Sequence, residues 1–556
     1  MSIGDAGAFL APTGSPIQQA KNLGLAIDVK RDYGASGSSA STTGTISAGS
    51  TTLTLASAED FKNGQGISVA GAGASGALLV TTIVSGAGTT TLTLKDAAST
   101  AVTGAAVNHD DTAAIQAAVN AGNIVIPIGT FKVNSPVTVP SNRVIQGVGH
   151  GSVVATGSGF ANNQGIFQAT SETDITVQGV TFDFSANSQA GMKAVWFQSC
   201  QRTSVLFNKF IQGGDVIAHT GCSDFIVQGN ICINGIGQTV IDNWGGCSRG
   251  VIDGNVVNGG GTSRSGILVT GINTDLSSNT TSDITVVGNT IYNTTDEGIW
   301  LQGGTGGVSP GMVEHCSVTG NIIDTVTTYH GIHVTEAQYC TISNNVIKNI
   351  AQRGISVTEE SSGAVSHDLV ISGNVLYNIN TSATAGINAI DLVTSGASNN
   401  VIQGNHITNV ANCDFAIGIA SGAVDNAITG NVVTAGSTGT IQGQTGNYIS
   451  GNVGKNPVGP VSPPASPLVS GTVYQNTYGV TVNIYQSAYA TTSGTAGGVT
   501  AACGPTSTPN AVFTQQISGT STSVSPDTLL LRVPSGWYYS FTASQVTLLN
   551  ANILGE

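Results

Sequence analysis

Charged side chains are scarce in this sequence. Only 8% of its 556 residues are Asp, Glu, Lys or Arg, whereas an average soluble domain has about 25%. The 16 Lys and Arg are outnumbered by 30 Asp and Glu and are scattered along the chain. This balance argues against a nucleic-acid-binding surface and against an anionic membrane as a partner. The polar surface must therefore consist largely of Ser, Thr, Asn and Gln.

Long apolar runs and paired cysteines are also missing. No stretch approaches the roughly 20 apolar residues of a membrane-spanning helix, so we expect no membrane insertion. The eight cysteines form no CxxC pair, and we predict neither a metal site nor a cofactor. The segment after Met1 lacks the basic and apolar regions of a secretory signal. We therefore expect release by another route, such as lysis, or an earlier removal of the signal.

What the sequence has instead is an internal repeat between about residues 200 and 455. A β-branched pair, usually a glycine, then an asparagine and further aliphatic residues recur at intervals of 21 to 34 residues. The repeated asparagines are Asn208, Asn230, Asn255, Asn289, Asn321, Asn345, Asn374, Asn405, Asn431 and Asn452. Apolar residues alternate around each of them, which indicates strands with one buried face. A period in the twenties with variable insertions is typical of a solenoid.

The repeated asparagine is predicted to lie at a turn and to bond to its counterparts on the neighbouring coils, as a stacked ladder. Glycines mark the start of a further strand in four coils, and the second residue after each glycine should point outward. These outward residues are Leu268, Trp300, His333 and Ser356. The pattern predicts an all-β fold, a right-handed parallel β-helix.

Cysteines keep the same register, since Cys200, Cys222 and Cys247 each lie eight residues before a repeated asparagine. They are expected to stack on successive coils. They are interpreted as small buried residues, and disulfides between coils are the alternative.

A short capping helix is expected where Asp110 and Asp111, as an acidic N-cap, precede apolar residues at helical spacing. This helix and three other motifs resemble the start of pectate-lyase-like β-helices, a group that includes many bacteriophage tailspikes. The motifs are Asp32-Tyr33-Gly34-Ala35, Asp110-Asp111-Thr112-Ala113-Ala114-Ile115-Gln116-Ala117-Ala118, Ile126-Pro127-Ile128-Gly129-Thr130-Phe131 and Gly147-Val148-Gly149. The resemblance is specific for the fold and only weakly specific for activity.

Five parts are predicted along the chain. They are an N-terminal segment with the start of the β-helix (1–36), an inserted small β-domain (37–105), the parallel β-helix (106–456), a Pro-rich linker (457–469) and a C-terminal β-sandwich (470–556). The inserted and C-terminal parts both show the alternation typical of strands. In tailspike-like proteins a terminal domain of this kind drives trimerisation or binds sugar, which the resemblance implies here.

Carboxylates are the candidate catalytic groups, because hydrolysis of a glycosidic bond needs two carboxyl groups about 5 to 9.5 Å apart. Glu336 and Glu359 each lie five residues after a strand glycine, so they are expected to be neighbours on adjacent coils. Asp296 and Glu297 directly precede the strand of Trp300. The alternative interpretation is solvated loop carboxylates or a weak cation site. Further carboxylates on other coils are Asp215, Asp242 and Asp391.

Aromatic and basic residues near these carboxylates are the candidate substrate-binding groups. Trp300, His333 and Trp244 could stack on or bond to sugar rings, and incidental surface residues are the alternative. A polysaccharide lyase would instead use a base, for which the candidates are Arg353, Tyr329, His330 and His333, with a cation such as Ca²⁺ or a neutralising side chain. Since few Lys and Arg are present to bind an anionic chain, hydrolysis is the preferred hypothesis.

The sequence and its resemblance together predict a tailspike-like protein that binds and cleaves a bacterial surface polysaccharide. The resemblance implies a homotrimer on a virion tail, in contact with other tail proteins. The alternatives are a non-catalytic receptor-binding fibre or adhesin and a secreted bacterial polysaccharide lyase.

Overall fold

The computed structural model describes residues 27–272, 280–304, 311–359, 365–455, 459–461, 463–477, 481–490, 496–518, 527–534, 536–544 and 546–555. Residues 1–26 of the predicted N-terminal segment, and residues 457, 458 and 462 of the predicted linker, lie outside them. The chain divides into two units, residues 1–327 and residues 328–556.

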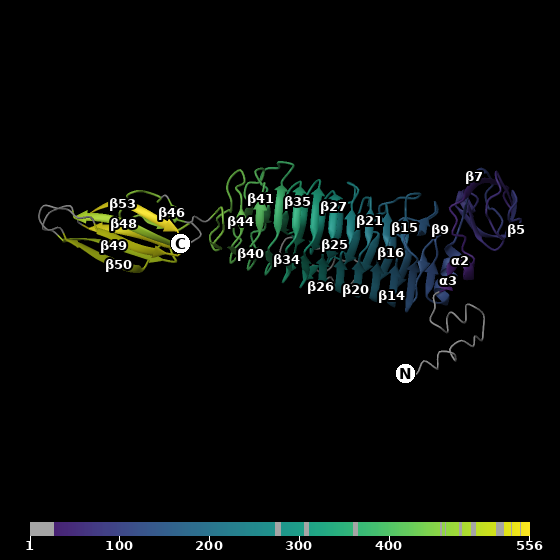
Figure 1. Ribbon diagram of the computed structural model, residues 1–556, viewed down its shortest axis with the longest axis horizontal. Coiled ribbons are helices and arrows are strands. Elements are labelled where there is room, and N and C mark those ends of the chain that lie inside the picture. The colour runs from purple at the N-terminus through teal and green to yellow at the C-terminus, as the bar shows by residue number, and fades with distance from the viewer. Residues whose placement is uncertain are drawn as a thin grey trace, which may run out of the picture. The chain divides into compact units, whose positions relative to one another are not determined.

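The first unit contains three parallel sheets, and each coil contributes one strand to each sheet (Figure 1). The first sheet runs through β1 (Ile27–Asp28), β8 (Ile124–Ile126), β11 (Arg143–Gly147), β14 (Thr173–Gln178), β17 (Gln201–Leu206), β20 (Ser223–Gln228), β23 (Ser248–Asp253), β26 (Thr280–Val287) and β30 (Ser317–Thr319), with β29 (Met312–Glu314) also on β26. The second sheet runs through β10 (Val137–Thr138), β13 (Gly165–Thr170), β16 (Lys193–Gln198), β19 (Ile217–Thr220), β22 (Ile241–Trp244), β25 (Ser265–Thr270) and β28 (Glu297–Gln302). The third sheet runs through β9 (Gly129–Val133), β12 (Ser152–Thr156), β15 (Thr181–Asp183), β18 (Lys209–Ile211), β21 (Ile231–Ile233), β24 (Val256–Asn258), β27 (Thr290–Thr294) and β31 (Ile322–Val326).

The second unit repeats this three-sheet arrangement. Its first sheet contains β34 (Thr341–Ser343), β37 (Val370–Ser372), β40 (Val401–Gln403), β43 (Ala427–Thr429) and β45 (Tyr448–Ser450), and the short β33 (Ala337–Gln338) precedes β34. Its second sheet contains β32 (His330–Thr335), β36 (Ile355–Thr358), β39 (Ile390–Leu392) and β42 (Ile417–Ile419). Its third sheet contains β35 (Val346–Ile350), β38 (Val375–Ile379), β41 (His406–Thr408) and β44 (Val432–Val433).

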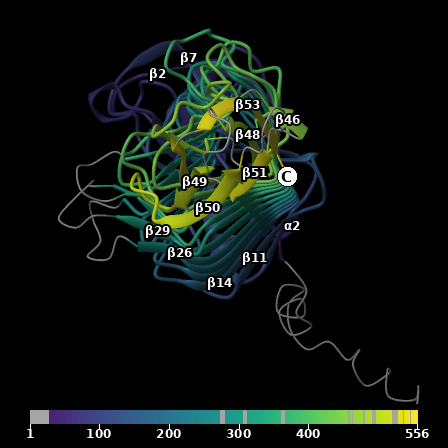
Figure 2. The same ribbon diagram turned by 90° about the vertical axis from the view of Figure 1, so that its left-hand side faces the viewer.

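The coils are held in register by buried asparagines, as predicted. The Nδ2 of Asn230 donates to the Oδ1 of Asn255 at 2.9 Å, and the backbone N–H of Asn230 donates to the same oxygen at 3.0 Å. The second unit has the same rung, in which Asn374 Nδ2 donates to Asn405 Oδ1 at 2.9 Å. Because each amide bonds to the next coil, a buried turn leaves few polar groups unsatisfied. Figure 2 looks along the stack of coils, with β11, β14 and β26 of the first sheet labelled.

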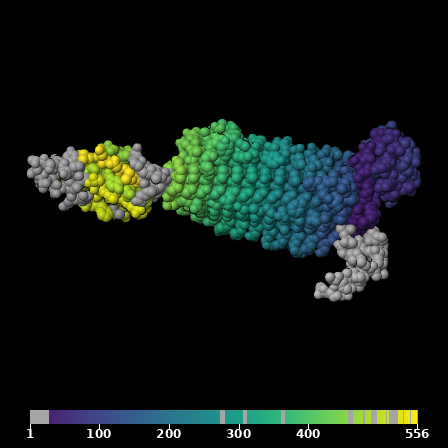
Figure 3. Space-filling model, in the orientation of Figure 1, coloured from purple at the N-terminus to yellow at the C-terminus, as the bar shows by residue number. Residues whose placement is uncertain are grey.

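The cores of the coils come from alternate strand residues, which point inward and stack on identical or similar residues. Ile217, Ile241 and Ile267 align on adjacent coils and are fully buried. In Figure 3 the surface of the blue and teal coils appears as closely stacked rows of side chains. All eight cysteines are buried and have free thiols. The residues after Cys200, Cys222 and Cys247 align in the first sheet, which agrees with the predicted stack of small buried residues rather than with disulfides.

Between β1 and β8 of the first sheet, the chain forms a closed antiparallel barrel. Its strands are β2 (Ser41–Ile46), β3 (Thr52–Leu55), β6 (Thr91–Leu94), β5 (Leu79–Ser85), β4 (Gly66–Val69) and β7 (Val102–His109) in spatial order, with a 3-10 helix, η2 (Ala74–Gly76). Alternate residues such as Leu53, Ile67 and Leu92 fill its core. The regular alternation seen in the sequence therefore corresponds to folded strands.

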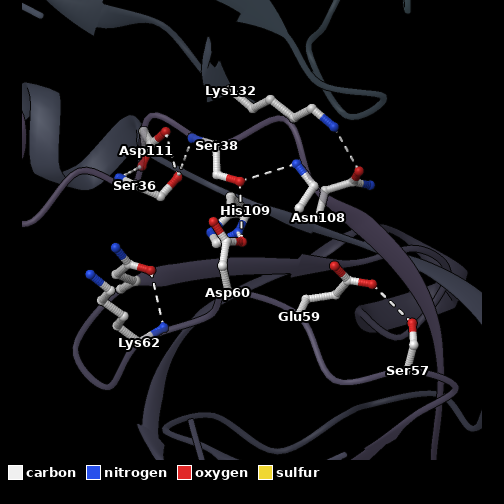
Figure 4. A network of polar contacts seen from close by, with 12 residues as sticks. Ser36, Ser38, Ser57, Glu59, Asp60, Lys62, Asn108, His109, Asp111 and Lys132 are labelled. Carbon is white, nitrogen blue, oxygen red and sulfur yellow. Dashed lines mark hydrogen bonds and ion pairs between the residues drawn. The ribbon is translucent and has the colours of Figure 1, made fainter. Parts of the chain in front are cut away.

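The end of the first unit carries α2 (Val29–Tyr33) and α3 (Thr112–Ala121). The expected acidic cap of α3 is wrong in one detail. Asp111 occupies the N-cap position, but its carboxylate accepts hydrogen bonds from the backbone and hydroxyl of Ser36 and none from the helix (Figure 4). Asp110 accepts from the Thr112 N–H at 3.0 Å instead. The Asp111 carboxylate is thus used to join two segments 75 residues apart in the chain.

The C-terminal sandwich consists of two four-stranded antiparallel sheets. One sheet contains β46 (Gly459–Val461), β53 (Val546–Gly555), β48 (Val482–Ala490) and β51 (Asp527–Val533), and the other contains β47 (Val473–Gln475), β52 (Tyr538–Ser544), β49 (Ala496–Gly504) and β50 (Ala511–Ser518). Val482 and Ile484 of one sheet pack in a common core with Tyr539 and Phe541 of the other. This packing is the predicted β-sandwich.

Candidate functional site

A cavity of about 620 Å³ lies on the outward face of the second sheet in the first unit. Strand register brings its walls together, because Asp242 of β22 aligns with Leu268 of β25, which aligns with Trp300 of β28. The next outward row aligns Trp244 with Thr270. Since alternate strand residues point to opposite faces, the residues between the two rows, Asn243, Val269 and Leu301, are buried in the core while these rows face the cavity.

Two carboxylates line the cavity in different environments. Asp215, in the loop before β19, forms an ion pair with Lys193 at 3.1 Å. Asp242 is 3% exposed, and its Oδ1 has no hydrogen-bond partner among the described residues. Burial, and then the nearby charge of Asp215, raise the pKa of Asp242 well above its usual value. Burial also raises the pKa of Asp215, but the Lys193 ammonium opposes that rise.

Two of the predicted substrate-binding residues line the same cavity. Trp244 is 42% exposed, whereas Trp300 is 9% exposed. A partly exposed indole can cover the apolar face of a sugar ring while its neighbours bond to the hydroxyls. Arg264 also lines the cavity and is paired with Asp296 at 2.9 Å.

The predicted acids Asp296 and Glu297 do not line this cavity themselves, but each binds a residue that does. Asp296 pairs with Arg264, and Glu297 is buried and accepts a hydrogen bond from the Ser265 hydroxyl at 2.7 Å. Both partners line the cavity.

Glu336 and Glu359 lie in the second unit, directly after β32 and β36. Thr335 aligns with Thr358, so the two glutamates follow aligned residues of adjacent coils, as their spacing indicated. Glu336 is fully buried, whereas Glu359 is exposed. The two carboxyl groups therefore experience very different solvation.

The other predicted binding residues also belong to the second unit. His333 shares a hydrogen bond of 2.7 Å with Thr358 Oγ1, and its ring lies 4.8 Å from that of His330. Burial, followed by the charges of His333 and Arg353, lowers the pKa of His330 to about 2. Tyr329 is 44% exposed. Arg353 forms an ion pair with Asp391 at 2.7 Å.

Sequence reasoning missed the importance of Asp215 and Asp242 and did not single out Lys193. The glycine that marks other strands of this sheet is absent before β22, where Thr239 and Val240 precede Ile241. One signal was available, because Asp242 is an acidic residue between the buried Ile241 and Asn243 in a strand.

Among the residues that the structure describes, no group of three His, Cys, Asp or Glu is arranged to hold a metal ion. No helix in the same part of the chain is long and apolar enough to cross a membrane.

Comparisons with known proteins agree with this architecture. A family model described as "right handed beta helix region" matches residues 271–459. The solved A-module of the Azotobacter vinelandii mannuronan C-5 epimerase AlgE6 is 17% identical over 63% of this chain and 96% of its own, with a TM-score of 0.50. The chain is a right-handed parallel β-helix protein. The predicted fold class is thereby confirmed.

Two further solved structures resemble this β-helix protein less closely in backbone. The tailspike protein of E. coli bacteriophage HK620, in complex with pentasaccharide, is 13% identical over 80% of this chain and 89% of its own, with a TM-score of 0.44. PfbA, a surface adhesin of Streptococcus pneumoniae, is 15% identical over 62% of this chain and 88% of its own, with a TM-score of 0.43. No curated protein sequence matches the chain.

Proposed function

We propose that the protein binds a polysaccharide on the outward face of the second sheet and hydrolyses a glycosidic bond in the cavity of the first unit. The observation that carries this proposal is the pair of carboxylates, the half-buried Asp215 and the buried Asp242, in one cavity with Trp244 and Trp300. Glycosidases require one protonated and one ionised carboxyl group, and unlike surroundings are what create such a pair.

The roles follow from the neighbours of each acid. Asp242 keeps its proton and donates it to the glycosidic oxygen as the bond from the anomeric carbon to that oxygen breaks. Asp215, which forms an ion pair with Lys193 at 3.1 Å, acts in its ionised form on the anomeric carbon side, either directly or by taking a proton from the attacking water. Water supplies a hydroxyl to one product and a proton to restore the acid, so the reaction needs no other reactant.

The walls of the cavity favour a neutral substrate. Its two cations, Lys193 and Arg264, are already paired with aspartates. Exposed polar residues of the lining such as Asn162 and Asn163 offer hydrogen bonds to sugar hydroxyls, and the indoles offer stacking surfaces. A neutral surface polysaccharide of bacteria is the proposed substrate class. The homotrimer, the contacts with other tail proteins and the location on a virion tail stay predictions.

The proposal is tested with Asp242→Asn, which removes the transferable proton and changes little in volume. We expect kcat on neutral capsular or O-antigen polysaccharides to fall by about 10² to 10⁴-fold, the usual contribution of a general acid. The measurement is release of reducing ends together with the mass of the products. Asp425→Asn is the matched control, because Asp425 is an exposed turn residue of the second unit.

Three results would contradict the proposal. Full activity of Asp242→Asn would exclude the acid, and unsaturated product ends would indicate a lyase. Binding of a polysaccharide by the wild-type protein without cleavage would favour the non-catalytic fibre or adhesin.

A further inference from the structure

A second, smaller cavity of about 250 Å³ lies on the second sheet of the second unit. Asp391 of β39 and the loop residues Asn388 and Phe415 line it. Drug-sized ligands occupy pockets of roughly 300 to 1,000 Å³, so this cavity has room for one sugar ring rather than for several.

The polar wall of the cavity is fixed by mutual hydrogen bonds. Asp391 accepts from Arg353 Nε at 2.7 Å and from Asn388 Nδ2 at 2.9 Å. The Oδ1 of Asn388 accepts from the backbone N–H of Phe415 at 3.0 Å. Asp391 is 4% exposed and Asn388 is 8% exposed. The wall is thus preorganised, which reduces the entropy that a ligand would otherwise lose in ordering it.

A glycine makes room for this wall. Gly418 of β42 aligns with Asp391 on the adjacent coil. A Cβ at Gly418 would lie 1.9 Å from Asn388 Nδ2 and 2.7 Å from Asp391 Oδ1. The Asn388 side chain can therefore lie across this position only because no side chain is there.

An aromatic ring completes the cavity. Phe415 is half-buried, lines the cavity and is attached to the polar wall through its own backbone N–H. An apolar ring beside fixed amide, carboxylate and guanidinium groups matches a pyranose, which presents an apolar C–H face and a rim of hydroxyls. The lining carboxylates of Asp391 and Asp414 outnumber the single cation of Arg353, which disfavours an acidic sugar.

We propose that this cavity is a second, non-catalytic binding site for one neutral sugar ring. It does not depend on the hydrolytic site, because it uses other residues in the other unit. Asp391 is held by two donors and serves as a hydrogen-bond acceptor, so no bond of the sugar is broken here.

The test is saturation-transfer-difference NMR on the full-length chain with D-glucose, D-galactose, D-mannose and N-acetyl-D-glucosamine, and with D-glucuronate as the acidic comparison. Phe415→Ala should weaken binding of the sugar that gives the strongest signal by about tenfold, the change that corresponds to about 1.4 kcal/mol. Gly418→Ala should weaken it as well, by displacing Asn388. Tyr377→Ala is the matched control, because Tyr377 is a 50% exposed aromatic residue of the same unit.

A signal that neither Phe415→Ala nor Gly418→Ala weakens when each is combined with Trp300→Ala, which impairs the first-unit cavity, would overturn the proposed site, provided that the variants keep the circular dichroism spectrum of the wild type. Stronger binding of glucuronate would overturn the ligand class, and no signal from any neutral sugar would overturn the proposal altogether. Trp300→Ala separates the two sites. It should impair hydrolysis and leave a signal that Phe415→Ala still removes, so that failure of either proposal is recognised by itself.

Discussion

Asp242 in the first unit and Asp391 in the second occupy the same place in their strands, directly after an inward isoleucine, yet their surroundings differ. Asp391 accepts hydrogen bonds from Arg353 and Asn388. Asp242 has one oxygen without a partner among the described residues, and burial raises its pKa. Donors around a buried carboxylate favour its role as a hydrogen-bond acceptor, whereas burial without a partner favours the protonated form.

The position of a residue in its strand therefore decides only whether its side chain points into the core or outward. The chemistry comes from neighbours on adjacent coils and from the loops between strands. Two aspartates at the same strand position can therefore serve hydrolysis in one unit and sugar binding in the other, as we propose.

The largest stability effect is expected for a buried group that must stay uncharged. His219 points inward, its ring lies 4.4 Å from that of Phe225, and burial lowers its pKa from 6.5 to about 3. The unfolded chain takes up this proton below pH 6.5, whereas the folded protein does so only near pH 3, so stability falls as the pH drops through this window. One pKa unit corresponds to about 1.36 kcal/mol, so the full loss is about 5 kcal/mol.

His219→Gln should remove most of this acid sensitivity, because the amide stays neutral and can still bond to Thr203. The measurement is the free energy of unfolding in denaturant across this pH range. His150→Gln is the control, since His150 is exposed. Parallel pH profiles of the wild type and His219→Gln would contradict the assignment.

The two aspartates should respond differently to replacement by asparagine. Asp391→Asn leaves the half-buried Arg353 without its anion. Breaking a fully buried ion pair costs roughly 3 to 5 kcal/mol, so the loss should lie at or below the lower end of that range. Asp242→Asn should leave stability unchanged or raise it. Because the folded pKa of Asp242 lies above the unfolded value of 3.8, the wild type loses stability as the pH rises through the folded pKa. The advantage of Asp242→Asn should grow in the same direction.

Urea unfolding of both variants at about pH 5 and about pH 8 measures the contrast. If both substitutions destabilise the protein by the same amount, the contrast between the partnered Asp391 and the unpartnered oxygen of Asp242 has no energetic consequence.

The fold could be predicted from the sequence because its constraints repeat. Asn255 bonds to the coils on both sides, so the same residue must return once in each coil. The inward isoleucines return for the same reason. Side chains that face the cavities carry no such constraint, since loops of different length cover them.

The site was therefore only partly predictable. Trp300 and Trp244 could be found from their outward positions and residue type. The partner of Asp215 could not, because Lys193 lies a coil earlier and its pairing depends on how the intervening loop folds. The difference in burial between Glu336 and Glu359 could not be predicted either. Glu336 is fully buried and adopts a φ of 39°, and no periodicity in the sequence signals this.

The smallest effect on stability is expected for ion pairs whose side chains are exposed to solvent. Arg249 binds Asp224 of the preceding coil through two hydrogen bonds, of 2.6 and 2.9 Å, and hydrogen bonding to Arg249 lowers the pKa of Asp224 to about 2. Their side chains are 59% and 39% exposed, so solvent and salt screen the attraction. Arg249→Gln should lower Tm only slightly at low ionic strength and not at all at high salt. A loss as large as that of Asp391→Asn, or one that salt leaves unchanged, would show that exposure does not govern the strength of these pairs.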